Sequence, residues 1–277
     1  MKILLGGASG FIGTALKKSL EADSHEVVAL ARDYEQRPFT YFDHFDTFIN
    51  LSGESIATRW TKKKKEVLIQ SRVGVTSFLA KMCENLSHPP RLFFCASAIG
   101  FYGDRKDEVI TEGSSKGEGF LADLCQKWEE SVQKAKKYGV QVVSTRFGLV
   151  LGKGGGILKK FILPVRFGSG EQYVSWIHIE DLTSSIVFLL RYPPNEEALN
   201  LTSPNPVPEK QLAHLLASLL HKPCLVLPSF LLKIIFGEMS HMLLDSIQVY
   251  PKLLLENGFS FRYPKLHMAL ASIFTKG

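Results

Sequence analysis

The amino-acid sequence predicts an α/β protein in which a doubly wound parallel sheet is joined to a smaller, helix-rich C-terminal lobe. Short apolar runs alternate with longer amphipathic runs as far as about Val150, which is the pattern of strands and crossover helices. A glycine-rich stretch directly after the first apolar run indicates a tight strand-to-helix turn. Beyond Val150 the periodicity is mostly helical and is broken by prolines, which predicts a separate lobe.

Buried parallel strands are expected from the apolar runs, because helices cover both faces of such strands. The expected strands are Lys2–Leu5, Glu26–Ala31, Thr47–Leu51, Arg91–Ala96, Val140–Arg146, Tyr173–Ile177 and Ala198–Leu201. The expected helices are Phe11–Ala22, Thr61–Leu86, Phe120–Tyr138 and Glu180–Arg191, with further helices from Pro208 onward. Strand–helix–strand connections are right-handed, so the helices are expected on both faces of the sheet.

Composition excludes several other classes of protein. Hydrophobic residues make up 45% and charged residues 22% of the 277-residue chain, which are the values of a folded domain rather than a disordered one. The four cysteines show no C-x-x-C spacing, so no metal site is expected. The longest apolar stretch, Leu225–Leu244, is interrupted by charged residues and a proline and predicts no membrane span. The chain opens on a strand-like run instead of a signal sequence, and a reducing cytoplasm is the expected location.

The net charge of +6 owes much to one basic cluster, Arg59 and Lys62–Lys65. Such a cluster beside Trp60 could contact phosphates, and nucleic-acid binding is kept as a minor hypothesis. The favoured interpretation is a solvated first turn of a helix. Apolar residues at helical spacing between Phe230 and Leu243 fit a core or a homodimer contact better than a membrane surface.

The motif GGASGFIG places Gly7, Gly10 and Gly13 between a strand and a helix, the context of a dinucleotide-binding turn. The first glycine allows the turn, the second lets the backbone approach a pyrophosphate, and the third lets the helix pack closely on the strand. The helix N-terminus then offers free N–H groups to phosphate oxygens. These glycines, with Phe11 and Ile12, are therefore predicted to bind a dinucleotide in a Rossmann-type fold. The alternative is a tight turn with no ligand.

The end of the second strand, in EVVALARD, indicates which dinucleotide binds. An acidic residue at the strand end would hold the 2′-hydroxyl of NAD, but Ala31 occupies that position and Arg32 follows it. Arginine pairs with a 2′-phosphate, so NADP(H) is favoured over NAD(H), unless Arg32 points into solvent. The next stretch, Asp33–Phe45, is too short for another strand with its crossover helix. Phe39–Phe42 is therefore either an abbreviated strand, or that edge of the sheet is missing.

Three polar residues are expected to have structural roles. Asp181 stands at the start of a helix and is predicted to be its N-cap. His178 lies on a strand between two isoleucines and is predicted to be hydrogen-bonded structure rather than a base. Arg146 ends a buried strand and is predicted to pair with a carboxylate or a loop carbonyl.

Further motifs follow the glycine turn in a fixed order. They are DTFINLSGE (46–54), ASAIGFYGD (96–104), STRFGLVLG (144–152) and SWIHIEDL (175–182). In this order they resemble the extended short-chain dehydrogenases/reductases, and most closely the atypical branch called the epimerase family. That branch contains sugar-nucleotide-epimerase-like proteins, some of which are named cell-division inhibitor. The resemblance covers essentially the whole chain. It implies an NADP(H)-binding Rossmann part over residues 1–151, and a part over residues 152–277 that completes the sheet (about 173–202) and forms a substrate lobe.

The resemblance also implies a set of site residues. Asn50, Leu51, Ser52 and Gly53 would line the cofactor, and Phe147, Gly148 and Leu149 would pass its nicotinamide end. Ser97 falls where the family places the serine or threonine of its catalytic set. Independently of the resemblance, Ser97 ends an apolar strand, and ligands bind at the carboxyl ends of strands in open α/β sheets.

The chain departs from the family pattern at the next helix. Members with ordinary redox chemistry carry Tyr-x-x-x-Lys there, as an acid/base and the cation that lowers its pKa. Alignment on Glu129 puts Leu121 and Cys125 at those positions. Tyr102 and Lys106 have the same spacing, but they lie in a loop rich in Gly and Asp. Side chains four residues apart share a face in a helix and not in such a loop. Tyr102 could still supply the missing proton; the alternative is an aromatic wall of the pocket.

Two functions follow. The first is an NADP(H)-dependent oxidoreductase or epimerase-like enzyme, in which Ser97 holds the oxygen of a small carbonyl or carbinol substrate and Tyr102 or water is the acid. The resemblance alone implies sugar nucleotides as the substrate class. The second is a non-catalytic NADP(H)-binding protein with a regulatory or interaction role in redox sensing or cell division, which the missing tyrosine and lysine favour.

Overall fold

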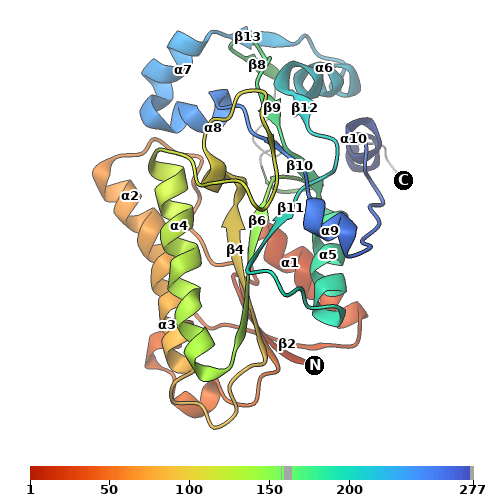
Figure 1. Ribbon diagram of the computed structural model, residues 1–277. Coiled ribbons are helices and arrows are strands. Elements are labelled where there is room, and N and C mark those ends of the chain that lie inside the picture. The colour runs from red at the N-terminus through yellow and green to blue at the C-terminus, as the bar shows by residue number, and fades with distance from the viewer. Residues whose placement is uncertain (157, 159–163, 275–277) are drawn as a thin grey trace.

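The computed structural model describes residues 1–156, 158 and 164–274. At its centre is a six-stranded sheet in the order β11-β6-β4-β3-β1-β2, in which all neighbouring strands are parallel (Figure 1). The strands are β1 (Lys2–Gly6), β2 (Glu26–Ala29), β3 (Thr47–Asn50), β4 (Leu92–Ala98), β6 (Gln141–Phe147) and β11 (Ala198–Leu201). The strand order reverses direction at β1, so the predicted Rossmann-type fold class is confirmed.

Helices cover both faces of this sheet (Figure 1). On one face α1 (Phe11–Ala22) packs against α5 (Ile179–Arg191), and the Ser19 hydroxyl donates to Thr183 Oγ1 between them at 3.0 Å. The other face is covered by α2 (Lys62–Ile69), α3 (Val75–Met82) and α4 (Phe120–Gln133).

A π-helical segment, η3 (Gln70–Gly74), interrupts the single helix expected over Thr61–Leu86. The helix begins as expected for its sequence, because the Thr61 side chain accepts the Lys64 N–H and caps α2. A π-turn adds a residue to the helix and turns the following side chains to a new face. Helical structure therefore runs from Lys62 to Met82 and ends before the expected Leu86.

The sheet ends at β2, and no further strand pairs with that edge in the part of the chain that the structure describes. Phe39–Phe42 forms a 3-10 turn, η2 (Phe39–Tyr41), and not a strand. Phe42 is buried and packs edge-on against Phe78 of α3, with ring centroids 5.6 Å apart. Phe39–Phe42 is therefore not an abbreviated strand, and the edge strand is missing. The stretch Asp33–Phe45 is long enough only for a turn whose aromatic side chains pack on α3.

Gly148 separates β6 from the strand that follows it. The backbone passes Ser175 so closely that a Cβ on Gly148 would lie 2.8 Å from the Ser175 carbonyl oxygen. Two short pairs form beyond this point: β7 (Leu149–Leu151) with β10 (Trp176–His178), and β9 (Tyr173–Val174) with β12 (Val207–Pro208). The expected strand Tyr173–Ile177 therefore lies outside the main sheet, and Ala198–Leu201 alone of the C-terminal residues extends it.

Most of the C-terminal lobe lies above the sheet in Figure 1, in teal to dark blue, whereas its helix over Lys252–Glu256 lies beside β11. Its elements are β8 (Val165–Phe167), α6 (Glu209–Leu220), β13 (Leu225–Leu227), α7 (Ser229–Phe236), α8 (His241–Leu244), β14 (Gln248–Val249), α9 (Lys252–Glu256) and α10 (Leu266–Phe274), and β14 pairs with β5 (Val109–Ile110). A second core around Trp176 and Leu216 joins α6 and α10 to β7 and β10. In the described residues no helix is both long enough and apolar enough to cross a membrane.

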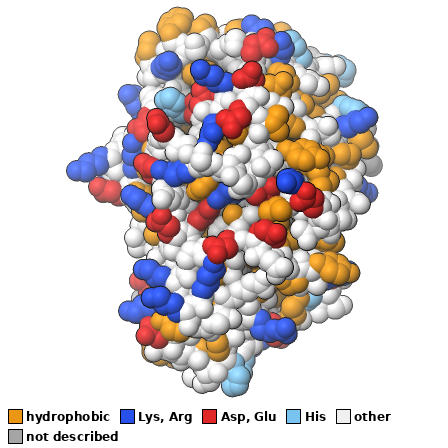
Figure 2. Space-filling view, in the orientation of Figure 1, with side chains coloured by type: hydrophobic (Ala, Val, Ile, Leu, Met, Phe, Trp, Pro, Cys, Tyr) orange, Lys and Arg blue, Asp and Glu red, His pale blue; other side chains and the backbone are white. Residues whose placement is uncertain are grey.

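Exposed apolar side chains gather on α7, at the top of the view in Figure 2. Phe230, Ile234 and Ile235 are exposed there, and Leu232 is buried beneath them. The left and centre of the visible face carry charges of both signs in a mixed pattern, and further hydrophobic side chains lie at its right (Figure 2). The homodimer contact expected for this segment stays a prediction.

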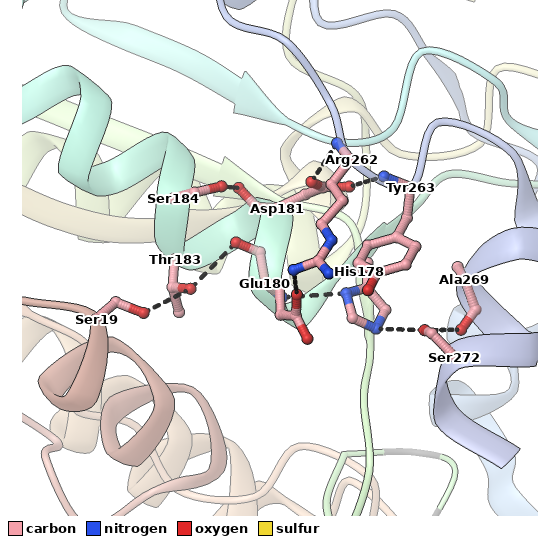
Figure 3. A network of polar contacts seen from close by, with 10 residues as sticks. All are labelled: Ser19, His178, Glu180, Asp181, Thr183, Ser184, Arg262, Tyr263, Ala269 and Ser272. Carbon is pink, nitrogen blue, oxygen red and sulfur yellow. Dashed lines mark hydrogen bonds and ion pairs between the residues drawn. The ribbon is translucent and has the colours of Figure 1, made fainter. Parts of the chain in front are cut away.

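A buried polar network ties the end of the chain to α5 (Figure 3). The Asp181 carboxylate accepts the backbone N–H groups of Arg262 and Tyr263 at 2.8 and 2.9 Å. The cap of α5 is His178, whose Nδ1 accepts the Glu180 N–H at 3.2 Å, so the prediction that Asp181 is the N-cap is wrong. The local sequence cannot show which of the two residues caps α5, because the groups that bind Asp181 lie about eighty positions further along the chain. Burial lowers the pKa of His178, which favours the neutral ring that can accept this bond.

Asp181→Asn tests this attachment. Because an amide offers one acceptor oxygen where the carboxylate offers two, one buried N–H loses its partner, at a cost of about 1–3 kcal/mol. We expect this loss in urea unfolding, together with faster hydrogen exchange at Arg262 and Tyr263. Glu180→Gln is the control, since its exposed ion pair with Arg262 should contribute less than about 1 kcal/mol. Equal stabilities of the two variants would contradict the assignment.

Candidate functional site

The glycine turn forms the close contact between α1 and β1. Gly7 has a φ of +74°, which favours glycine, and its carbonyl accepts the Gly10 N–H at 3.0 Å. A Cβ on Gly13 would lie 2.1 Å from the Gly7 carbonyl oxygen, so only glycine allows the helix to approach this closely. Gly10 caps α1 without a side chain, and the first N–H groups of the helix are left to a ligand. This cradle fits the pyrophosphate of a dinucleotide.

The turn after β3 is shaped by one side chain, that of Asn50. Its Oδ1 accepts the Ser52 N–H at 3.0 Å, and its Nδ2 donates to Thr76 Oγ1 at 2.9 Å. Asn50 is fully buried, and both ends of its amide are used. The turn Leu51–Gly53 is therefore held open along the carboxyl edge of the sheet, beside the glycine turn.

A cavity of about 1120 Å³ extends from these turns to the C-terminal lobe. Eight of the predicted site residues line it: Phe11, Ile12, Leu51, Gly53, Ser97, Phe147, Gly148 and Leu149. The others, Gly7, Gly10, Gly13, Arg32, Asn50, Ser52 and Tyr102, are not among the described lining residues. Arg32 is exposed on the loop after β2, and no hydrogen bond or ion pair involves it among the described residues. The far wall belongs to the C-terminal lobe and includes Tyr173, Glu209, His241 and Asp245.

Ser97 is the last residue but one of β4, at the wall of the cavity, and is 2% exposed. Its hydroxyl donates to Glu129 Oε1 of α4 at 2.6 Å. Arg146 of β6 donates to both oxygens of the same carboxylate, from Nε at 2.8 Å and from a terminal nitrogen at 2.7 Å. Because its hydrogen points to Glu129, Ser97 presents lone pairs to the cavity and can accept a hydrogen bond from a ligand hydroxyl.

Glu129 is the carboxylate partner that the sequence predicted for Arg146 without identifying it. Burial alone lowers the pKa of the guanidinium, but the hydrogen bonds and charge of Glu129 outweigh this effect and raise the pKa of Arg146. The ion pair is largely shielded from water, with side-chain exposures of 6% and 12%. Arg146 therefore stays charged, and its guanidinium engages both oxygens of the Glu129 carboxylate.

Tyr102 is fully buried beside this ion pair. Its hydroxyl accepts from Arg146 at 2.9 Å and donates to Asn200 Oδ1 at 2.8 Å, and burial raises the pKa of the phenol. The side chain packs against Ile110 and Val249, away from the cavity wall. In this position Tyr102 accepts a hydrogen bond from Arg146 and is not among the described residues that line the cavity.

Leu121 and Cys125 occupy the positions where the resemblance predicts an acid/base tyrosine and lysine. Both side chains lie on α4 and line the cavity next to Ser97. Burial raises the pKa of Cys125 to about 11, so the thiol is protonated and unreactive near neutral pH. The described wall beside Ser97 therefore contains an apolar side chain and a neutral thiol at these two places.

Sequence reasoning missed the charged residues of the cavity wall, which include Arg72 and Glu209. Arg72 lies on η3, a segment with no fully buried residue, so no sequence signal distinguishes it from a surface arginine. Glu209 begins α6, where an acidic residue is ordinary, and its carboxylate accepts the Phe167 N–H at 3.1 Å. Burial raises the pKa of Glu209 to about 7.

The basic cluster is partly neutralised by ion pairs. Lys65 binds Glu238 of the C-terminal lobe, and Lys64 lies 3.8 Å from the Glu54 carboxylate. These contacts favour the solvated helix turn over a nucleic-acid surface. Among the described residues a possible metal-ligating group of Asp43, His44 and His88 lies elsewhere, in the loops that precede β3 and β4.

A parallel sheet, a glycine cradle at its first helix and a cavity along its carboxyl edge define a dinucleotide-binding α/β protein. Residues 3–202 match the NAD dependent epimerase/dehydratase family, and the chain belongs to that family. Residues 227–273 match a domain of unknown function. The resemblance stated from the motifs is therefore confirmed.

Several members of this family match the chain over nearly its whole length. It is 34% identical over 297 residues to Epimerase family protein YfhF of Bacillus subtilis (strain 168), covering 99% of this chain and 98% of the relative. It is 33% identical over 302 residues to the chloroplastic SDR39U1 homolog of Arabidopsis thaliana, covering 99% and 86%. Among solved structures, human epimerase family protein SDR39U1 with NADPH gives a TM-score of 0.89 at 30% identity, covering 99% of both chains.

Arg146→Met tests the ion pair beneath Ser97. It leaves the Glu129 carboxylate buried without its cation, and we expect the free energy of unfolding to fall by about 3–5 kcal/mol. Tyr102→Phe removes one neutral partner of Arg146 and should cost only about 1 kcal/mol. Urea unfolding of both variants makes the comparison. A smaller loss in Arg146→Met than in Tyr102→Phe would contradict this role.

Glu209 predicts a pH dependence of stability. Its pKa is about 7 in the folded protein against an ordinary value of 4.5, so folding favours the protonated form. The associated stability is present at about pH 4.5 and is lost as the pH rises through 7. We expect the wild type to lose on the order of 3 kcal/mol relative to Glu209→Gln between about pH 4.5 and pH 8. Parallel pH profiles of unfolding for the two proteins would exclude the effect.

Proposed function

We propose that this protein is an NADP(H)-dependent oxidoreductase or epimerase-like enzyme that acts on a small carbonyl or carbinol compound. The observation that carries the proposal is the continuous cavity, which joins the start of α1 to Ser97 and then to the C-terminal lobe. A dinucleotide laid along the carboxyl edge would bring its nicotinamide end to Ser97 and Phe147–Leu149. The space beyond these residues is left for a substrate.

The residues present fit an NADP(H) cofactor. The cradle at Gly7–Gly13 would hold the pyrophosphate, and the turn Leu51–Gly53 would line the middle of the molecule. Arg32 is exposed on the loop after β2, where the adenine ribose of a dinucleotide lies, and its guanidinium is available for a 2′-phosphate. The NADPH in the structure of the 30% identical human relative supports this choice over NAD(H).

Ser97 would contact the reacting oxygen. When bound, the cofactor supplies or takes up a hydride at the adjacent carbon. Because Ser97 offers lone pairs, it is suited to accept the hydrogen bond of a substrate hydroxyl and so to orient an alcohol for oxidation. Tyr102 lies outside the cavity wall, so we propose that water in the cavity takes up or returns the proton and that Tyr102 acts through Arg146.

One observation favours a second function. Leu121 and Cys125 give the site no acid/base group at the places where the family resemblance implies one. The alternative is therefore a protein that binds NADP(H) without turnover, as a regulatory or interaction protein.

The buried free thiols of the protein, Cys83, Cys95 and Cys125, fit the reducing cytoplasm that we propose for either function.

A fluorescence titration with NADPH and NADH tests the cofactor. We expect NADPH to bind more tightly, and Arg32→Ala to weaken NADPH by about tenfold or more, because a charged hydrogen bond to phosphate is lost. NADH binding should be unchanged in the variant. If the wild type binds neither cofactor, both functions fail. If Arg32→Ala binds NADPH as the wild type does, the basis of the NADP(H) preference is wrong.

Turnover of NADPH or NADP⁺ with a panel of carbonyls and alcohols separates the two functions. Ser97→Ala should lower any turnover by at least about tenfold and leave the dissociation constant of NADPH within about twofold. Lys127→Ala, an exposed residue on the same helix as Cys125, is the control. Turnover that survives in Ser97→Ala would exclude Ser97 as the catalytic residue. NADPH binding with no turnover across the panel would favour the regulatory protein.

A further inference from the structure

Arg72 lies in the wall of the cavity, at the π-helical segment between α2 and α3. Its guanidinium passes beside the turn after β3. A Cβ on Gly53 would lie 3.1 Å from Arg72 Cζ, so the missing side chain at Gly53 makes room for the cation. π-Turns recur at functional sites because they redirect one side chain out of the helical pattern. Here the redirected side chain carries a charge to the cavity.

The charge of Arg72 has no carboxylate partner within 4.0 Å among the described residues. Its nitrogens donate to the carbonyl oxygens of Leu68 at 3.3 Å and Glu54 at 3.0 Å, and to Ser71 Oγ at 3.4 Å, all of which are neutral. The Glu54 carboxylate is directed to Lys64. Burial lowers the pKa of Arg72, and the nearby charge of Glu54 offsets this effect only in part, so the desolvated cation is not fully compensated. Such a group favours a ligand that supplies acceptor oxygens.

Arg72 is held in place from two sides. Thr76 Oγ1 donates to the Arg72 carbonyl at 2.8 Å, and the same oxygen accepts from Asn50 and from Trp128 Nε1. The Trp128 ring lies under the guanidinium, with Arg72 Cζ 5.3 Å from its centroid. The residue that shapes the turn after β3, Asn50, therefore also fixes the segment that carries Arg72. A cation held in this way loses little side-chain entropy when a ligand binds.

Its place along the sheet indicates which part of a dinucleotide it would meet. From β2 the order runs through β1 and β3 to β4, with the adenine end expected near Arg32 and the pyrophosphate at α1. Arg72 contacts the turn after β3 and lies near Cys125, which is itself next to Ser97 of β4. It is therefore on the nicotinamide side of the pyrophosphate.

We propose that Arg72 binds the ribose oxygens of the nicotinamide half of the cofactor and makes the site prefer the reduced form. The proposal rests on the proposed function. The nicotinamide ring is neutral when reduced and cationic when oxidised, and a fixed guanidinium nearby repels only the oxidised ring. The family resemblance predicts a lysine at the position of Cys125. Arg72 would thus supply a cation near this position, where the chain has no lysine.

Calorimetric titrations of NADPH, NADP⁺ and 2′,5′-ADP test the proposal, because 2′,5′-ADP carries only the adenine half. We expect Arg72→Met to weaken NADPH binding about tenfold, since hydrogen bonds from a cation are lost, and to leave 2′,5′-ADP within about twofold. The wild type should bind NADPH more tightly than NADP⁺, and the variant should narrow this ratio. Arg72→Lys keeps the charge and should keep the ratio. Arg105→Met is the matched control, since Arg105 also lines the cavity but is paired with Glu108.

Distinct outcomes would overturn the proposal. Equal loss of NADPH and 2′,5′-ADP in Arg72→Met would place Arg72 at the adenine half or make it a folding residue. If Arg72→Met binds all three ligands as the wild type does, or keeps the wild-type ratio of NADP⁺ to NADPH affinity, Arg72 does not set the preference for the reduced cofactor. If Arg72→Met does not fold, Arg72→Gln provides the same comparison. A wild type that binds none of the ligands would instead refute the proposed function.

Discussion

The buried ion pair between Glu129 and Arg146 is the interaction on which the site depends. It joins α4 to β6, and through the hydroxyl of Ser97 it reaches the end of β4. Two opposite charges removed from water must stay together, because either one alone would be left buried without compensation. Ser97 is oriented by its hydrogen bond to Glu129, and the buried Tyr102 accepts a hydrogen bond from Arg146.

The two arginines of the site differ in whether a carboxylate balances their charge. Arg146 is neutralised by a bidentate carboxylate and is part of the scaffold, whereas Arg72 meets only neutral acceptors at the cavity wall. A compensated guanidinium has little to offer a ligand, and an uncompensated one has its charge available. The same side-chain type therefore stabilises the fold at one position and is suited to recognition at the other.

The missing edge strand also affects ligand binding. With β2 at the edge of the sheet, the loop that carries Arg32 has no further strand beside it among the described residues. Recognition of the adenine end would depend on an exposed side chain, while the opposite end lies in a cavity closed by the C-terminal lobe. We expect binding energy to be concentrated at the pyrophosphate and nicotinamide parts of the cofactor for this reason.

The sequence by itself determined the parallel sheet, the glycine turn, the position of Ser97 at a strand end and the two replaced positions on α4. The first three depend on local patterns, since hydrophobic periodicity and glycine spacing act over a few residues, whereas the two positions on α4 come from the family resemblance. Tertiary structure alone decided which carboxylate pairs with Arg146, that His178 and not Asp181 caps α5, that Tyr102 turns away from the cavity, and that Arg72 reaches it. Those outcomes depend on which charged and polar groups meet after folding, and such partners are separated along the chain by distances that no local pattern encodes.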